Sequence, residues 1–260
     1  MKKNKSLFVI LSILVVLVLV IILSSTIFCL KNVKLNFMNI TTKLTNQNEE
    51  IISSGNFKFN QSIFFVNKEK YRQTLEKNNP YLKVVNIETI FPSTIVINAV
   101  EREELFATKS YVGGEFAGYL IYDDELKVLN VDKKYENNKL NAINLEISGV
   151  NADSVSVGEK LNFEQNNLIE GLANELYGYD NNPSILRAIF EKITLNYSSN
   201  DDVLILMRSG TEILIKGSSV KLGDKFRLAL STYNKISDKQ NSKIEVREHS
   251  DGVIRGTIIS

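Results

Sequence analysis

The chain has 260 residues and a formal net charge of +1 at pH 7, from 31 basic and 30 acidic residues. This balance gives no electrostatic footprint for a nucleic-acid partner, and one cysteine cannot form an internal disulfide. The single histidine, His249, stands in the polar segment REHSDG, which excludes a multi-histidine metal site and disfavours a Ser-His-Asp triad. We therefore predict no catalytic residue, no cofactor and no metal site.

The first predicted element is a membrane helix at residues 7–30, LFVILSILVVLVLVIILSSTIFCL, which carries no charge. About 20 apolar residues span the hydrocarbon layer, whereas a cleaved signal peptide has a shorter apolar region and small residues at the cut. A lipoprotein anchor on Cys29 would need a small residue where Phe28 stands, so we expect Cys29 to be inert near the helix end. Lysines before the helix outnumber those just after it, which favours residues 1–6 as a cytoplasmic tail.

Residues 31–102 predict a small mixed unit outside the membrane. An alternating strand at 33–37 precedes a short helix, for which Asn46 offers an N-cap and Glu49 the third position of a capping box. Gly55 ends this helix, and a second amphipathic helix follows at 68–77.

Two strands, 81–90 and 94–100, complete the unit on either side of a turn at Pro92. Glu101 and Arg102 follow directly and open the charged run EREE. Alternate strand residues face opposite sides, so we interpret the run as a solvated joint between two units and not as a catalytic acid pair.

Residues 103–260 predict a second, mainly antiparallel β domain with flanking helices. Two strands surround a turn within 118–129, and a helix near 166–179 carries one apolar face. Strands at 188–197, 202–208 and 211–217 follow, the last two joined as a hairpin. A final helix at 224–236 and the strands KIEVRE and GVIRGTII close the chain.

The segment FPSTIVINAVERE, placed one small unit after the anchor, resembles the FtsQ/DivIB family of bacterial cell-division proteins. In that family, the last two strands of the membrane-proximal POTRA domain contain a P-x-T-apolar turn, then alternating aliphatic residues, then Glu-Arg. The positions of this sequence that match are Pro92, Thr94, Ile95, Ile97, Ala99, Glu101 and Arg102. The resemblance implies an α+β fold, with a single transmembrane helix, a POTRA-like β-α-α-β-β domain and a β domain.

The rest of the chain extends this resemblance and also departs from it. GYLIYDDELKVL is similar to a family strand pair, and IEVR at 244–247 stands where the family has I-D-L-R, with Glu245 in place of aspartate. Residues 104–107 stand where the family often has a proline and a small aliphatic pair, so the resemblance does not predict the path of the joint there.

The resemblance implies a non-enzymatic divisome scaffold, anchored in the bacterial cell membrane at the division septum. Its partners would be FtsB/DivIC-like and FtsL-like single-pass proteins, with septal wall synthases as a further partner. In the family a partner strand is added near the carboxyl-terminal strands, as an open sheet edge permits. The candidate residues here are Ile244, Val246, Arg247, Val253, Ile254, Arg255 and Thr257, with sheet core as the alternative role of the apolar ones.

A second interpretation is a membrane-anchored POTRA protein that serves another envelope assembly, in secretion or sensing. An anchored wall hydrolase is disfavoured because the sequence offers no credible nucleophile or metal set.

Overall fold

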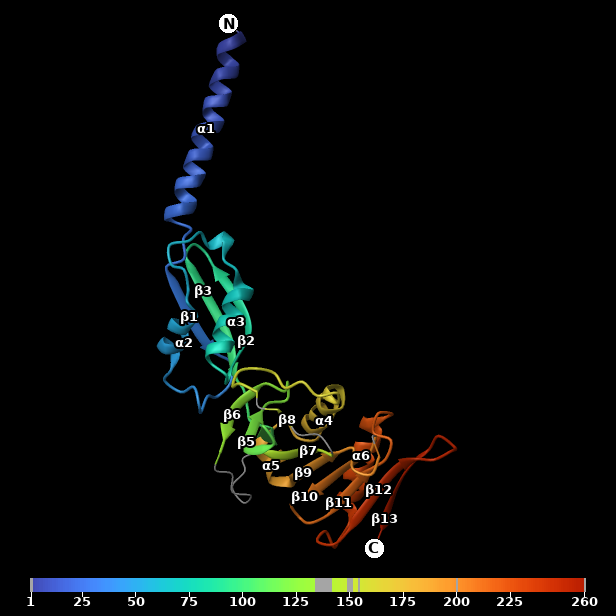
Figure 1. Cartoon of the computed structure of the whole chain (residues 1–260). Helices are drawn as coiled ribbons and strands as arrows, with labels where there is room; N and C mark the ends of the chain where they lie inside the picture. The colour runs from blue at the N-terminus through green and yellow to red at the C-terminus, as the bar shows by residue number, and fades with distance from the viewer. Residues whose placement is uncertain (1, 134–141, 149–151, 154, 200, 260) are drawn as a thin grey trace. The chain divides into compact units, whose positions relative to one another are not determined.

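A computed structural model describes residues 2–133, 142–148, 152–153, 155–199 and 201–259 (Figure 1). The chain divides into two compact units, Met1–Arg102 and Glu103–Ser260, called unit 1 and unit 2 below. Each has its own hydrophobic core.

Unit 1 begins with helix α1, Lys2–Thr26. The side chains described on it from Phe8 to Ile22 are exposed and uncharged. Within the part of the chain that the structure describes, no helix has the length and apolar character needed to cross a membrane. The membrane anchor at residues 7–30 therefore stays a prediction.

The helix ends earlier than the sequence predicts. Leu30 is fully buried in the core of unit 1, and Cys29 is buried beside it. The Leu30 N–H donates to the carbonyl of Gln61 at 2.9 Å, and its own carbonyl accepts from the N–H of Asn60 at 2.9 Å. Placing residues 27–30 in the helix was wrong, because their backbone groups bond to a neighbouring loop instead of continuing the helix.

The rest of unit 1 is a three-stranded sheet with two helices. Its elements are β1 (Asn32–Phe37), α2 (Asn48–Ser54), the 3-10 turn η1 (Ile63–Phe65), α3 (Lys68–Asn78), β2 (Leu82–Ile90) and β3 (Thr94–Glu101). The sheet order is β1-β3-β2, with β1 parallel and β2 antiparallel to the central β3. Ile95, Ile97 and Ala99 of β3 are fully buried, as their alternation predicts.

Two asparagines before the helices of unit 1 behave differently. The Asn67 side chain accepts the Lys70 N–H at 3.0 Å and so caps α3. Asn46, the predicted N-cap of the first helix, has a φ of 64° and lies outside α2, whose N-cap Gln47 makes no side-chain cap hydrogen bond. The predicted capping box was wrong, because Asn46 turns the chain in a left-handed conformation before the helix begins.

Unit 2 contains one ten-stranded sheet in the order β13-β12-β11-β10-β9-β7-β4-β5-β6, with β8 paired to β4. Its first elements are β4 (Phe106–Val112), β5 (Glu115–Tyr122), β6 (Val128–Asp132), β7 (Ile143–Ile147), β8 (Ala152–Asp153), α4 (Asn166–Tyr179) and α5 (Pro183–Ile189). The remaining elements are β9 (Phe190–Leu195), β10 (Val203–Met207), β11 (Glu212–Ile215), α6 (Leu222–Lys235), β12 (Lys243–Glu248) and β13 (Ile254–Ile259).

The sheet of unit 2 is mixed but mainly antiparallel, since its antiparallel strand pairs hold more paired residues than its parallel ones. β4 pairs in parallel with β7, β7 with β9, and β11 with β12. Parallel neighbours need a long crossover connection, and here α4 and α5 connect β7 to β9 while α6 connects β11 to β12. The α+β class is confirmed, and antiparallel pairing predominates as predicted, together with parallel pairs that the sequence does not predict.

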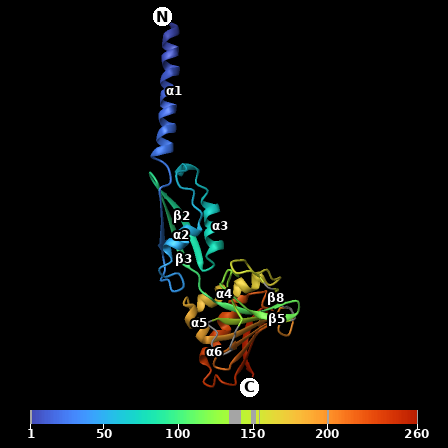
Figure 2. The same ribbon diagram turned by 60° about the vertical axis from the view of Figure 1, so that its left-hand side comes forward.

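The core of unit 2 lies between the sheet and the helices α4 and α6 (Figure 2). Leu172 and Leu176 of α4 are fully buried, and Phe226 and Leu230 of α6 are buried with them. Their i, i+4 spacing places each pair on one face of its helix, which is why the sequence predicted both helices. Phe190 stacks on Phe226 with ring centroids 6.3 Å apart and so joins β9 to α6.

Candidate partner-binding site

The open edge of the unit 2 sheet beside α6 is the strand β13. Among the described strands, β13 is the terminal one of the order and pairs with β12 alone, while β12 pairs with β11 on its other side. Ile244 and Val246 of β12 are 1% and 0% exposed and belong to the core. For these two candidate residues the core role is the one observed, so the candidate contact surface moves to β13.

The backbone of β13 has a defined outward side. The Val246 carbonyl accepts the Lys216 N–H at 2.9 Å, so it points toward β11 and away from β13. Val246 lies opposite Gly256, which makes this a non-hydrogen-bonded pair of the antiparallel ladder. Ile254, Gly256 and Ile258 therefore direct their backbone N–H and C=O groups to the free edge.

The two faces of β13 differ in what covers them. Gly256 faces α6, because a Cβ added there would lie 3.2 Å from the Thr232 hydroxyl oxygen. Ile254 shares this face and packs against the core, whereas Ile258 at the far end of the strand is 54% exposed. Arg255 and Thr257 lie on the opposite face and are exposed.

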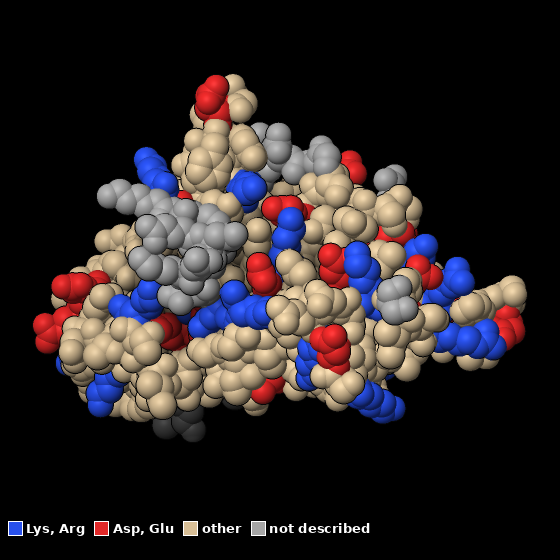
Figure 3. All heavy atoms as spheres, turned by 90° about the horizontal axis from the view of Figure 1, so that it is seen from below, with Lys and Arg blue, Asp and Glu red and all other residues tan. Residues whose placement is uncertain are grey.

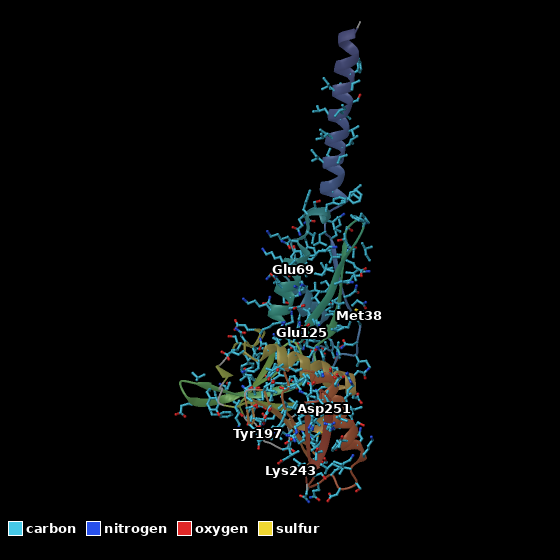
Figure 4. All side chains as sticks on the ribbon, turned by 90° about the vertical axis from the view of Figure 1, so that its right-hand side faces the viewer. Met38, Glu69, Glu125, Tyr197, Lys243 and Asp251 are labelled. Carbon is cyan, nitrogen blue, oxygen red and sulfur yellow. The ribbon has the colours of Figure 1, made fainter. Side chains whose placement is uncertain are left out.

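Charged groups cover that opposite face. Arg247 of β12 and Arg255 of β13 lie directly opposite one another. Arg247 Nε lies 3.5 Å from Glu245, and Arg255 lies 2.5 Å from Asp251 in the β12–β13 hairpin. The hydrogen bond from Arg255 lowers the pKa of Asp251 below its ordinary value. Figure 4 labels Asp251 and Lys243 in this part of unit 2.

The hairpin that leads into β13 is closed by its own hydrogen bonds. The His249 N–H donates to the Val253 carbonyl at 3.0 Å, and the Gly252 N–H donates to the His249 carbonyl at 2.8 Å. Gly252 has a φ of 74°, which favours glycine in this turn. Val253 itself is 49% exposed and is the most accessible apolar residue at the start of the edge.

Glu101 and Arg102 do not form a solvated joint. Each is 7% exposed, and the Glu101 carboxylate accepts backbone N–H groups from Thr42, Lys43 and Leu44 at 2.8–3.1 Å. Arg102 Nε donates to the Leu82 carbonyl at 3.3 Å. The expectation of solvation was wrong, because backbone donors from a loop far away in sequence satisfy the carboxylate inside unit 1.

Among the residues that the structure describes, no group of three or more His, Cys, Asp and Glu side chains could hold a metal ion. On the face drawn in Figure 3, basic and acidic side chains are interspersed, which does not favour a polyanionic ligand there.

Comparison with known proteins fits the arrangement of unit 1. Residues 34–102 match a family model described as the POTRA domain, FtsQ-type. The cell division protein DivIB of Clostridium acetobutylicum is 26% identical over 214 residues, which cover 76% of this chain and 79% of the relative. DivIB of Clostridium tetani is 26% identical over 207 residues, covering 76% and 74% respectively.

The fold and these matches define a protein with an FtsQ-type POTRA domain followed by a domain with a mixed β-sheet. The POTRA match and the two DivIB relatives support the FtsQ/DivIB family of bacterial cell-division proteins, which the segment at 91–103 predicts.

Proposed function

We propose that the chain is a non-enzymatic scaffold of the bacterial division machinery, which binds its partners outside the membrane and helps to regulate septal wall synthesis. The family match supports a role in division, and the open edge of β13 supports a role in binding. In this proposal α1 anchors the protein in the cell membrane, and both units lie on the outer side.

The partner adds a strand to β13. The outward N–H and C=O groups of Ile254, Gly256 and Ile258 are the groups that an added strand would pair with. Backbone pairing supplies affinity, while exposed side chains such as Ile258 and Thr257 supply specificity. The partners are the single-pass FtsB/DivIC-like and FtsL-like proteins that the family resemblance implies.

The two opposed arginines, Arg247 and Arg255, favour a partner strand that carries an acidic residue near Arg255. Arg247 and Arg255 are like charges directly opposite one another, which destabilises a strand pair. Asp251 and Glu245 each offset one of them. A partner carboxylate near Arg255 would add a charge-assisted hydrogen bond.

Proline substitution tests strand addition at one backbone position. Ile258→Pro removes an N–H from the free edge and leaves the β12 ladder donors intact, and edge strands tolerate proline. Ile258→Ala, the matched control, keeps the N–H and shortens the side chain. We expect Ile258→Pro to weaken binding of a FtsB/DivIC-type partner to the full-length protein about tenfold or more, and Ile258→Ala to weaken it less. Equal affinity of wild type and Ile258→Pro would overturn the strand-addition proposal.

Localisation tests the cellular role separately. A fluorescent fusion of the full-length chain should gather at the septum of dividing cells. A uniform membrane signal in those cells would contradict the division role and favour the other envelope assemblies.

A further inference from the structure

Phe28, Phe64 and Phe91 form a cluster of rings at one end of unit 1, and together with Phe65, the residue after Phe64, they are called the aromatic apex below. The ring centroids of Phe28 and Phe64 are 5.4 Å apart, those of Phe64 and Phe91 5.4 Å, and those of Phe28 and Phe91 6.2 Å. Phe64 and Phe91 are 55% and 57% exposed, and Phe65 beside them is 86% exposed. Large apolar side chains gathered in this way on a surface mark a contact site.

The aromatic apex is built on fixed backbone. The Ile63 N–H donates to the Phe28 carbonyl at 2.9 Å, which ties η1 to the segment that follows α1. The Lys31 N–H donates to the Ser93 carbonyl at 2.9 Å, which ties the same segment to the turn between β2 and β3. The three segments therefore present their rings as one rigid surface.

The aromatic apex lies where the chain leaves α1. Helix α1 ends at Thr26, and two residues of extended chain reach about 7 Å at most, so Phe28 lies within that distance of the helix end. In the proposed function α1 is embedded in the bilayer, and the inference rests on that anchor. Rings so close to the helix end would then stand at the level of the lipid headgroups.

We propose that the aromatic apex inserts into the interfacial layer of the membrane and holds unit 1 against the bilayer surface. Phenylalanine side chains at the membrane surface bury their apolar rings at the boundary between the headgroups and the acyl chains. A protein partner would also cover apolar rings, but the continuity of the aromatic apex with the uncharged part of α1, residues 7–26, favours lipid.

The proposal places the opposite end of unit 1 away from the lipid. β1 begins at Asn32, next to the aromatic apex, and its six residues extend about 20 Å. Met38 follows β1, lies at the end of unit 1 remote from α1, and is 62% exposed (Figure 4). It is a matched control for Phe65, since both are exposed apolar residues of the same unit.

The chain contains no tryptophan, so a single introduced tryptophan reports on its own position. We would reconstitute the full-length protein in phosphatidylcholine vesicles that contain lipids brominated either near the headgroup or deep in the acyl chains, each of which quenches tryptophan at its own depth. Three variants would be compared: Phe65→Trp in the aromatic apex, Met38→Trp at the opposite end, and Leu17→Trp within α1. We expect quenching of Leu17→Trp and Phe65→Trp, and a Met38→Trp emission that the brominated lipids leave unchanged.

The outcomes separate the inference from the anchor on which it rests. Quenching of Leu17→Trp without quenching of Phe65→Trp would keep the membrane anchor and overturn insertion of the aromatic apex. Equal quenching of Phe65→Trp and Met38→Trp would also overturn it, because contact would not be confined to the aromatic apex. Failure to quench Leu17→Trp would overturn the anchor, and the inference with it.

Discussion

The carboxylate of Glu101 accepts both the backbone N–H and the hydroxyl of Thr42, each at 2.8 Å. Thr42 lies in the loop between β1 and α2, and Glu101 is the last residue of β3. Lys43 and Leu44 add their N–H groups to the same carboxylate. One ionised side chain therefore holds a loop that has no regular secondary structure of its own at these positions.

Neutralising this carboxylate should loosen unit 1. Glu101→Gln keeps the shape but replaces one acceptor oxygen with an NH2 group that faces N–H donors. We expect the free energy of unfolding of unit 1 to fall by about 2 kcal/mol, because hydrogen bonds to a charged group are lost in a buried place. Glu103→Gln is the control, since Glu103 is exposed. Urea unfolding of the full-length protein in detergent would measure both, and equal stability of the two variants would contradict the assigned role of Glu101.

The tight approach of β13 to α6 at Gly256 should be sensitive to one methyl group. A Cβ there would lie 3.2 Å from Thr232 Oγ1, so Gly256→Ala should destabilise the edge strand by about 1 kcal/mol. Thr232→Ala in the same chain should restore part of that loss. Hydrogen exchange of the β13 amides in the wild type, the two single variants and the double variant measures the coupling energy between Gly256 and Thr232. Strictly additive effects of the two substitutions would contradict a steric contact between these positions.

Asp202 should make unit 2 less stable in acid. Burial opposes ionisation of Asp202, but hydrogen bonds from Ser198, Gly217 and Ser199 outweigh it and lower the pKa of its carboxyl. A depressed folded-state pKa contributes stability that is present above the ordinary aspartate pKa, about 3.9, and is lost as pH falls through the folded-state value. The free energy of unfolding should therefore fall less steeply with decreasing pH for Asp202→Asn than for the wild type. An unchanged slope would assign the acid sensitivity to other groups.

Tyr122 should make the same unit less stable in alkali. Burial raises the pKa of this phenol, while its hydrogen bond with the Thr108 hydroxyl acts in the opposite direction. Because the folded-state pKa is raised, its stability contribution is complete below the ordinary tyrosine pKa of about 10 and is lost as pH rises above it. In Tyr122→Phe the free energy of unfolding should fall less steeply as the pH rises above about 10. Some pH dependence should remain, since burial also raises the pKa of Tyr177. A slope as steep as that of the wild type would contradict this.

Local sequence patterns predicted the helices α3, α4 and α6 because the apolar residues at helical spacing form the buried face of each helix. Capping was harder, since Asn46 and Asn67 are the same residue type and only backbone geometry decides which one caps a helix. Helix α5 was missed, although Asn182 and Pro183 form a start signal there.

The site was harder to predict than the helices because it depends on pairing between distant strands. KIEVRE and GVIRGTII look alike as candidate edge strands in sequence. Only the parallel pairing of β11 with β12 makes β12 internal and leaves β13 at the edge. Glu101 shows the same limit, because its donors lie 57–59 residues earlier in the chain.

The parallel pairing of β1 and β3 has a mechanical consequence. The chain enters the sheet of unit 1 at Asn32 and leaves it at Glu101, at opposite ends of two neighbouring parallel strands. A pull that separates α1 from unit 2 would drag β1 and β3 in opposite directions along their length. Such a load falls on all the hydrogen bonds of the ladder together, in shear, and not on one bond after another. Unit 1 is therefore arranged to carry tension between its two covalent connections.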